Sequence, residues 1–510
     1  MKKIIGRIVI VVPALVLQAA WYVFVITWLN KVFNGYLADA AAFLFAVLAI
    51  IFVTSLVSRR DESSYKMLWA IVIVAMPILG AILYLFLGNK RTGTKLSKNL
   101  EKTGIKPQTI SGIAGQDYSD LIRADDLRIS QSMERITKST GWPVLKNGQT
   151  RYYPFGEDMF HDMCEDLKQA KKYVYIEYFI IENGLFWDTL TGILADKAAQ
   201  GVDVRVMYDD LGSIGTYSMI DVVELTKKGI RCIPFNPLLF IKTQLNNRDH
   251  RKIMVIDGEV AYSGGVNLAD EYINEKEKFG RWKDIGFRIT GEGVISYVYM
   301  FSEFWNAYCR KEDQIDINLV QISREPSADN GLILPYYDSP MRDEHTSNVF
   351  YTEMLSVATD YIWFYTPYLM LGDALFDAFI RAAGRGVDVR IIMPGIPDKK
   401  MVFRLSRSYY KDLIKAGVKV YEYTPGFVHA KACIMDDKLC TIGTVNLDYR
   451  SLFLHFECNS IFYKSDIVSC LKADFLKTLT TCRRIRTEDT KKGPLGRLAD
   501  NFLRLLAPLL

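Results

Sequence analysis

A long internal repeat restricts the fold of this chain more than any other feature of its sequence. The pentapeptide Gly-Val-Asp-Val-Arg occurs at 201–205 and again at 386–390. Each copy follows a β-branched and aromatic run, at 173–181 or 361–365, and then a stretch with helical periodicity. Alternating strands and helices predict sheets that are covered by helices. A duplication of such long period predicts two related halves, because a solenoid would repeat over a much shorter distance.

The repeat includes residues that are suited to chemistry. After one histidine in each half, a lysine follows two positions later, an aspartate seven, a glycine fourteen and an asparagine seventeen positions later. The first copy comprises His250, Lys252, Asp257, Gly264, Gly265 and Asn267, and the second comprises His429, Lys431, Asp436, Gly443, Thr444 and Asn446. The chain has only five histidines, so two of them at matching places argue against chance.

These residue types in this order predict an anion site. Residues two apart in a strand share a face, so each histidine and its lysine can reach one ligand. The apolar run 253–256 predicts a strand covered on both faces, and Asp257 with Gly258 predicts a turn after it. The glycines allow the backbone to approach a bound group closely, and the asparagine amide can donate to it. We expect a phosphate group in this place.

Two copies of the motif suit phosphoryl transfer. One imidazole can attack phosphorus while the other donates a proton to the departing alkoxide. The lysines and asparagines can surround the equatorial oxygens, where negative charge develops. This chemistry needs no divalent metal, and the sequence has no acidic ligand cluster, so we expect neither a metal nor a cofactor.

The duplicated pattern resembles the HKD motif of the phospholipase D superfamily, and its flanks at 264–272 and 443–451 are similar to that family as well. Over residues 40–510 the chain resembles bacterial cardiolipin synthases. The resemblance implies an α/β fold of two pseudo-symmetric αβα sandwich domains, behind N-terminal transmembrane helices, with both motifs in one active site. It implies that His250 is the nucleophile, which carries a covalent phosphatidyl group, and that His429 is the acid and base.

The same resemblance implies a membrane-bound phosphatidyltransferase that makes cardiolipin and glycerol from two phosphatidylglycerol molecules. A phospholipase D-type hydrolase, or another phosphatidyltransferase of the same mechanism, is the alternative. Phosphatidylglycerol and membrane lipids are therefore the expected partners. A nucleic acid is not expected, because 63 basic against 58 acidic residues give a net charge of only +5.

Four carboxylates, two within the motif and two outside it, need a role. A carboxylate should orient each histidine through its second ring nitrogen. Asp284 and Glu457 are the candidates because they precede the matching runs 285–289 and 458–463, although either could be an ordinary solvated acid at a strand start. The motif aspartates, Asp257 and Asp436, count among the catalytic residues by resemblance, but their places at turns favour a structural role.

The apolar residues are concentrated before residue 90, in the runs 8–29, 40–57 and 67–87. About 20 apolar residues span a bilayer as a helix, so these runs predict a multi-pass protein of the bacterial cell membrane. Basic residues on both sides of the third run conflict with three full spans. Pro77 and Gly80 at its centre also fit a re-entrant or interfacial segment, and the pattern leaves both arrangements open.

The predicted domains follow from these features: an anchor (1–90), a linker (91–150), a first motif domain (151–325), a second motif domain (326–485) and a C-terminal amphipathic helix (486–510). In the last of these, six apolar residues form one helical stripe: Leu495, Leu498, Phe502, Leu505, Leu506 and Leu509. A stripe of this kind fits a helix in the membrane interface or one packed on the catalytic core. The eight cysteines form no C-x-x-C pair, and we expect free thiols.

Overall fold

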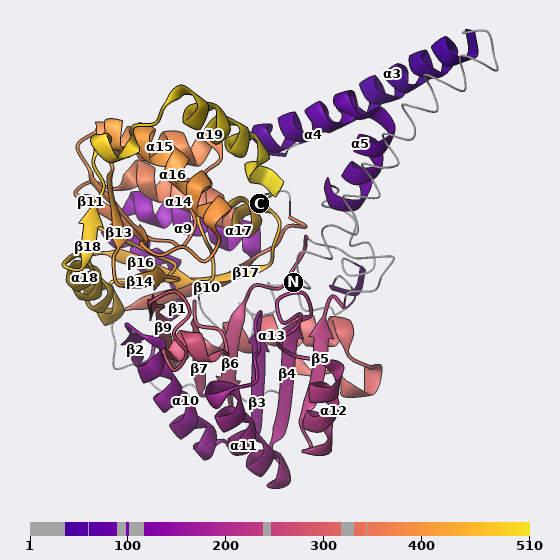
Figure 1. Ribbon diagram of the computed structural model, residues 1–510. Coiled ribbons are helices and arrows are strands. Elements are labelled where there is room, and N and C mark those ends of the chain that lie inside the picture. Colours follow the sequence, from indigo (N-terminus) through magenta and orange to yellow (C-terminus); the bar gives the residue numbers. More distant parts are fainter. Residues whose placement is uncertain are drawn as a thin grey trace. The chain divides into compact units, whose positions relative to one another are not determined.

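The structure is a computed structural model that describes residues 36–59, 61–88, 98–100, 102, 117–237, 246–317, 331–342 and 344–509 (Figure 1). The chain divides into two compact units, residues 1–92 and 93–510, which are described separately. The predicted apolar run 8–29 lies outside the described residues.

The N-terminal unit consists of helices. They are α3 (Tyr36–Val57), α4 (Ser63–Ala75), α5 (Pro77–Leu83) and the π-helical turn η2 (Tyr84–Gly88). Helix α3 contains the predicted run 40–57 and exposes large apolar side chains, among them Phe43, Ile50 and Ile51. Among the helices that the structure describes, none combines the length and the apolar character needed to cross a membrane.

The predicted run 67–87 is not one continuous helix. Helix α4 ends at Ala75, and α5 begins at Pro77, which has no N–H to continue the helix. The two arms lie against each other: a Cβ at Gly80 would collide with the backbone of Val72, and one at Gly88 would collide with the Trp69 ring. This segment is therefore a tight helical hairpin, which agrees with the re-entrant alternative.

In the second unit, the first half of the repeat has the following elements: β2 (Thr150–Tyr153), α10 (Gly156–Gln169), β3 (Tyr173–Tyr178), α11 (Leu185–Ala199), β4 (Asp203–Asp209), α12 (Met219–Lys227), β5 (Arg231–Phe235), β6 (Lys252–Ile256), β7 (Val260–Gly264), η4 (Asp270–Ile273), β8 (Arg281–Lys283), β9 (Gly286–Thr290), α13 (Val294–Tyr308) and η5 (Lys311–Asp313). Seven of these strands form a sheet in the order β2-β9-β7-β6-β3-β4-β5.

The second half has the following elements: β10 (Leu332–Asp338), α14 (Thr346–Val357), β11 (Tyr361–Tyr365), α15 (Asp373–Gly384), β12 (Asp388–Pro394), α16 (Lys400–Lys415), β13 (Lys419–Tyr423), β14 (Gly426–Val428), β15 (Ala432–Met435), β16 (Leu439–Gly443), α17 (Tyr449–Phe453), β17 (Glu457–Tyr463), α18 (Asp466–Leu479), β18 (Cys482–Arg484), η7 (Thr487–Thr490), α19 (Pro494–Leu506) and η8 (Ala507–Leu509). Its sheet has the order β1-β10-β17-β16-β15-β11-β12-β13-β18.

The two sheets share one topology. The seven strands β10-β17-β16-β15-β11-β12-β13 of the second sheet correspond one to one, in this order, to the seven strands of the first sheet. Strands β1 and β18 extend the second sheet at its two edges. In the first sheet β3, β4 and β5 are parallel, and in the second β11, β12 and β13 are parallel. The motif strands β6 and β15 pair antiparallel with β3 and β11. The predicted duplication of a mixed α/β fold is therefore confirmed.

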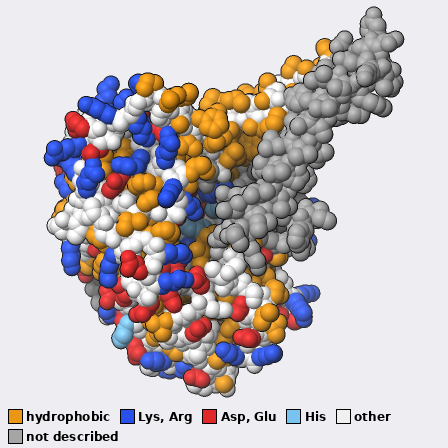
Figure 2. Space-filling model, viewed as in Figure 1, with side chains coloured by type: hydrophobic (Ala, Val, Ile, Leu, Met, Phe, Trp, Pro, Cys, Tyr) orange, Lys and Arg blue, Asp and Glu red, His pale blue; other side chains and the backbone are white. Residues whose placement is uncertain are grey.

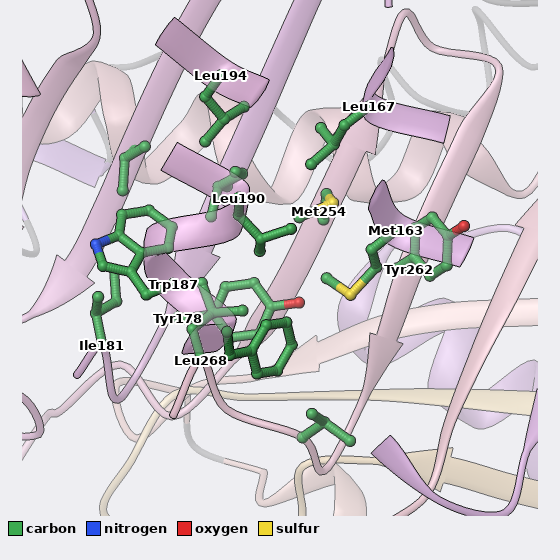
Figure 3. Packing of buried hydrophobic residues seen from close by; sticks show 14 of the residues in the cluster. Met163, Leu167, Tyr178, Ile181, Trp187, Leu190, Leu194, Met254, Tyr262 and Leu268 are labelled. Atoms are coloured by element: carbon green, nitrogen blue, oxygen red, sulfur yellow. The ribbon is translucent and has the colours of Figure 1, made fainter. Parts of the chain in front are cut away.

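Helices cover both faces of each sheet. On the first sheet, α10 and α11 contribute the apolar core shown in Figure 3, in which Met163, Trp187 and Leu190 face Met254 of β6. Helix α13 packs on the opposite face against β3, β6 and β7 and also contacts β10 of the second sheet, so its surface is almost entirely buried. Helix α18 lies correspondingly between the second sheet and β2. The halves thus share a continuous interior.

The predicted linker 91–150 contributes to the second half of the repeat. Its described part contains α8 (Ser119–Asp125), α9 (Leu127–Thr140) and β1 (Leu145–Lys146). Strand β1 pairs with β10, and α9 packs on α14. All eight cysteines are free thiols, and five of them are buried.

Candidate active site

Both motif histidines stand where a segment of one half pairs with a segment of the other. The bridge between Asp249 and Phe456 is parallel, and the His250 N–H donates to the Phe456 carbonyl over 2.9 Å. In the matching place, β8 of the first half pairs parallel with β14 of the second, and the His429 N–H donates to the Lys283 carbonyl over 2.7 Å. Each of these two pairings between the halves therefore ends with a histidine on one segment and a carboxylate residue on the other: His250 with Glu457, and His429 with Asp284.

The two carboxylates contact the histidines crosswise. Nδ1 of His250 lies 2.8 Å from Oε2 of Glu457, and Nδ1 of His429 lies 2.6 Å from Oδ2 of Asp284. Both carboxylates are fully buried, so neither is the solvated acid that the sequence also allowed. A carboxylate on Nδ1 favours the tautomer with its proton there and leaves Nε2 available for reaction. The geometry fits the predicted orienting role.

The motif lysines lie beside their histidines in the same buried cluster. Lys252 Nζ donates to the His250 carbonyl over 2.6 Å, and Lys431 Nζ donates to the His429 carbonyl and lies 2.7 Å from its Nδ1. The charges of Lys431 and His429 act on His250, and each lysine interacts with both buried carboxylates. The two copies of the motif therefore meet in one site.

Burial dominates the electrostatics of the cluster. It lowers the pKa of Lys252 to about 8 and that of Lys431 to about 7. Burial and the neighbouring lysine charges also lower the pKa of His429 to about 4 and hold the pKa of His250 well below its usual value. Both imidazoles are consequently neutral at pH 7.

The carboxylates differ in charge state. The pKa of Asp284 is lowered, because His429 and Lys431 outweigh its burial. Burial raises the pKa of Glu457 to about 8. His429 therefore faces an ionised partner that stabilises an imidazolium, whereas Glu457 is less able to stabilise a positive charge on His250.

The motif glycines pack against the segments that carry the two carboxylates, and a close approach of their backbone to a ligand stays a prediction. A Cβ at Gly265 would lie 2.8 Å from the carboxyl carbon of Asp284. Gly264 has a φ of 141°, and a Cβ there would collide with the backbone of Ile285, while Gly443 is confined in the same way by Cys458. Thr444, the counterpart of Gly265, donates its hydroxyl to Glu457.

The motif asparagines make hydrogen bonds within the protein. Asn267 accepts from the Ile180 N–H over 3.1 Å and donates to the Tyr272 hydroxyl over 2.7 Å. Asn446 donates to Asp448 over 3.2 Å, and its buried Oδ1 has no hydrogen-bond partner among the residues that the structure describes. Contact of either amide with a substrate stays a prediction.

The motif aspartates lie at the far ends of their strands from the histidines. Asp257 accepts three backbone N–H bonds, from residues 171, 172 and 173, at 2.7 to 2.8 Å. Asp436 does the same at residues 359, 360 and 361. The strand β6 separates Asp257 from the site, which excludes contact with the reacting atoms and supports the structural role.

Two ionic networks behind the site escaped the sequence analysis. Arg248 pairs with Asp209 at 2.9 Å, and Arg251 pairs with Glu177 at 2.5 Å and with Asp249, all of them buried on either side of His250. Strand alternation places Arg251 on the side away from Lys252. The sequence does not show that Arg248 pairs with Asp209 or that Arg251 pairs with Glu177, because these acids lie on the distant strands β4 and β3.

A third network joins the halves beside His429. Lys283, one residue before Asp284, is buried and donates to Asp474 over 2.8 Å and to the Pro154 carbonyl over 2.6 Å. Asp474 also accepts from the Tyr152 hydroxyl over 2.8 Å. This pair holds β8 against α18 next to the pairing between the halves that supplies Asp284.

Aromatic rings form the walls around the imidazoles. His429 lies among Tyr272, Trp282 and Phe427, and His250 contacts the edge of Phe179. Within the described part of the chain, no group of three or more His, Cys, Asp or Glu side chains is arranged to hold a metal ion.

The remaining histidines have different surroundings. His161 is exposed. His345 is half-buried against the ring of Phe453. His455 is buried, and it is close enough to His250 to lower the pKa of that residue. No contact among the described residues assigns His455 a role of its own.

A duplicated α/β fold that brings two histidine–lysine motifs into one site defines the phospholipase D-like class, and the comparisons agree. Residues 163–280 and 351–479 match the family profile described as cardiolipin synthase, PLD-like domain. Residues 43–89 match the profile described as phospholipase D-nuclease N-terminal.

Full-length relatives narrow the class. The chain is 34% identical over 494 residues to a cardiolipin synthase of Geobacillus sp. (strain WCH70), which covers 94% of this chain and 96% of the relative. It is 42% identical over 459 residues to an uncharacterized protein of Streptococcus mutans, covering 89% of this chain and 98% of that protein. The chain therefore belongs to the cardiolipin synthase family of phospholipase D-like proteins.

A solved structure shares the fold. The crystal structure of phosphatidylserine synthase from Haemophilus influenzae Rd KW20 matches with a TM-score of 0.57 and 14% identity, over 74% of this chain and 100% of the other. At this identity the likeness concerns the fold alone.

Proposed function

We propose that this protein is a membrane-bound phosphatidyltransferase that converts two phosphatidylglycerol molecules to cardiolipin and glycerol. The observation that carries the proposal is the crossed pair of histidine–carboxylate contacts within one buried cluster that also holds two lysines. The names of the relatives, cardiolipin synthases, support the choice of lipid.

The first half-reaction forms a covalent intermediate. Nε2 of His250 attacks phosphorus, the bond from phosphorus to the glycerol oxygen breaks, and His429 gives its proton to that oxygen. The bound phosphodiester offsets the lysine charges, which raises the pKa of His429 and lets it carry the proton that ionised Asp284 stabilises. His250 stays neutral, as a nucleophile must, because burial lowers its pKa and because Glu457, whose own pKa is raised, stabilises an imidazolium less than Asp284 does.

The second half-reaction transfers the phosphatidyl group. His429, now neutral, takes the proton from a hydroxyl of a second phosphatidylglycerol, whose oxygen attacks phosphorus and displaces His250. Lys252 and Lys431 are placed to stabilise the charge on the equatorial oxygens in both steps. The cation charges are worth most here because the site is buried.

We propose that the protein is located in the bacterial cell membrane, with several segments of the chain inserted in the bilayer. The apolar side chains exposed on α3 support this, because a helix that is apolar all round needs an apolar environment. The match of residues 43–89 to the N-terminal family profile agrees. The hairpin formed by α4 and α5 returns to its starting side, which removes the conflict between the basic residues on its two flanks.

Product analysis tests the reaction. Purified full-length protein is incubated with phosphatidylglycerol in detergent micelles, and the lipids are separated by mass. Cardiolipin and glycerol in equal amounts are expected, and neither forms with the H250A or H429A variant. Phosphatidic acid as the main product would instead establish the alternative, a phospholipase D-type hydrolase.

An activated donor separates the two histidine roles. A phosphatidyl ester of p-nitrophenol has a leaving group that departs without a proton from the enzyme. We expect H429A to release a burst of one p-nitrophenol per site and to retain a phosphatidyl group on His250, while H250A gives no burst. A burst in H250A that is absent from H429A would reverse the assignment.

A further inference from the structure

The C-terminal helix α19 is attached to the protein through its polar side. Asp500 is buried and accepts from Arg404 of α16 over 2.9 Å. Arg504 donates to Ser408 and Asp412, one and two turns further along the same helix. The side of α19 that faces the catalytic core therefore consists of charged residues, contrary to the usual orientation of an amphipathic helix.

The first three residues of the apolar stripe of α19 consequently point away from the core, whereas Leu505 and Leu506 are half-buried. Leu495 is 83% exposed, Leu498 67% and Phe502 60%. Figure 2 shows apolar side chains beside basic ones over the part of the surface where α19 runs in Figure 1. Exposed apolar side chains in a continuous row mark a surface that another apolar phase or molecule covers. The sequence allowed a helix in the membrane interface or one packed on the catalytic core. In the structure α19 is attached to the core and still exposes apolar side chains.

The surroundings of the stripe are basic. Between Arg483 and Arg504 the chain has seven basic and three acidic residues. Helix α16, on which α19 rests, has five lysines and arginines and one aspartate. Leucine and phenylalanine within a basic border suit an interface of acyl chains and anionic headgroups, where both parts of the surface find a partner.

We propose that α19 lies in the headgroup region of an anionic lipid bilayer, with Leu495, Leu498 and Phe502 inserted among the acyl chains. The inference rests on the exposed stripe and its charges and does not depend on the proposed reaction.

This contact has a consequence for the active site. The last turn η8 packs on α17, where Arg450 donates to the Leu509 carbonyl over 2.9 Å. Helix α17 begins at Tyr449, directly after the second motif with Asn446, and Asp448 caps it. A bilayer that holds α19 thereby also holds the second motif at a constant depth relative to the headgroups.

Depth measurements on the full-length protein test the proposal. Leu498 or Phe502 is replaced by cysteine in a C470A background, which removes the exposed native thiol, and labelled with the fluorophore NBD. The matched control is a label at Ile220 of α12, which is 72% exposed. The proteins are reconstituted in vesicles of phosphatidylglycerol and phosphatidylcholine with or without acyl-chain nitroxide lipid.

We expect nitroxide lipid to quench the labels at 498 and 502 by about twofold or more, because an interfacial helix inserts its apolar face roughly 5–10 Å deep. The label at 220 should stay unquenched. Pure phosphatidylcholine should reduce quenching at 498 and 502. Equal quenching at 220 and 498 would overturn the proposal. Protection of 498 and 502 from both lipid-borne and water-soluble nitroxide would also overturn it, since protein would then cover the stripe.

Substitutions provide a second readout. The L498E/F502E variant should transfer phosphatidyl groups about tenfold more slowly on vesicles and normally in detergent micelles, because micelles present substrate without a planar surface. I220E should be unaffected in both. Wild-type rates of L498E/F502E on vesicles would contradict the proposal. Absence of cardiolipin synthesis in the unaltered protein would refute the proposed function alone and leave the quenching result valid.

Discussion

The contact between Gly265 and Asp284 gives a sharp test of the crossed histidine–carboxylate arrangement. A Cβ at position 265 would lie 2.8 Å from the carboxyl carbon of Asp284, against 3.4 Å for the onset of ordinary contact. The G265A substitution therefore forces the carboxyl group back by at least about 0.6 Å. Gly265 does not have a positive φ, so alanine brings no backbone strain, and the effect is confined to this contact.

Displacement of Asp284 weakens the 2.6 Å contact that orients His429. A misplacement on the order of 1 Å at a reacting group costs about 10²-fold in rate, or about 2.7 kcal/mol of transition-state stabilisation. We expect G265A to lower kcat by roughly this factor and to leave KM nearly unchanged, because the lysines still bind the phosphate. The assay is steady-state cardiolipin formation in detergent micelles.

The control is G192A in α11, where a Cβ meets nothing within 4 Å. It should keep full activity and gain roughly 0.5–1 kcal/mol of stability from the better helix former. In a D284A background, G265A should have no further effect, because the displaced group is already gone. Wild-type kcat in G265A, or an undiminished effect of G265A in the D284A background, would refute the reasoning.

Three further predictions concern the ionic framework. D474N should destabilise the protein by about 3–5 kcal/mol, because it leaves Lys283 buried without its partner. In thermal unfolding, the double change K283M/D474L should regain most of this loss, and an unchanged melting temperature in D474N would contradict the prediction. D257N should cost about 1–2 kcal/mol, because one of three backbone N–H groups loses its acceptor, with kcat unchanged; a large fall in kcat would restore a catalytic role. Because Lys431 has a pKa of about 7 and Lys252 of about 8, both lose charge as the pH rises, and kcat/KM should fall from pH 7 to 9, while K431R should move the decline to higher pH; a flat profile up to pH 9 would exclude these lysines as the charges that bind substrate.

Much of the fold was predictable because its elements have strong local patterns. The strand expected at 361–365 is β11 without change, and the helical stretch expected before residue 201 is α11, which ends at Ala199. The apolar run 253–256 became the buried strand β6 because a continuous apolar run suits a strand with both faces covered. The run 67–87 was ambiguous because hydropathy measures length and polarity and is insensitive to a fold-back at proline.

The sequence predicted which residues belong to the site, but it did not predict how they pair with one another. Asp284 and Glu457 were recognised by their places before matching strands, yet Asp284 contacts the histidine of the other half. Nothing in the spacing distinguishes the direct pairing from the crossed one, because that choice depends on how two separate strand ends meet. The pairing of Arg248 with Asp209 and of Arg251 with Glu177 was missed for the same reason, since these acids come from strands distant in the chain.

What the chain order alone determined is the duplication, the types of its elements and the chemical groups that each copy brings, because periodicity, turns and motif spacing are local properties. The tertiary structure decided which carboxylate serves which imidazole and which side of α19 meets the core. Both depend on contacts between residues more than about 90 positions apart, as in the pairs Asp284–His429 and Arg404–Asp500. Their energies come from burial and charge in the assembled fold, where desolvation decides the outcome.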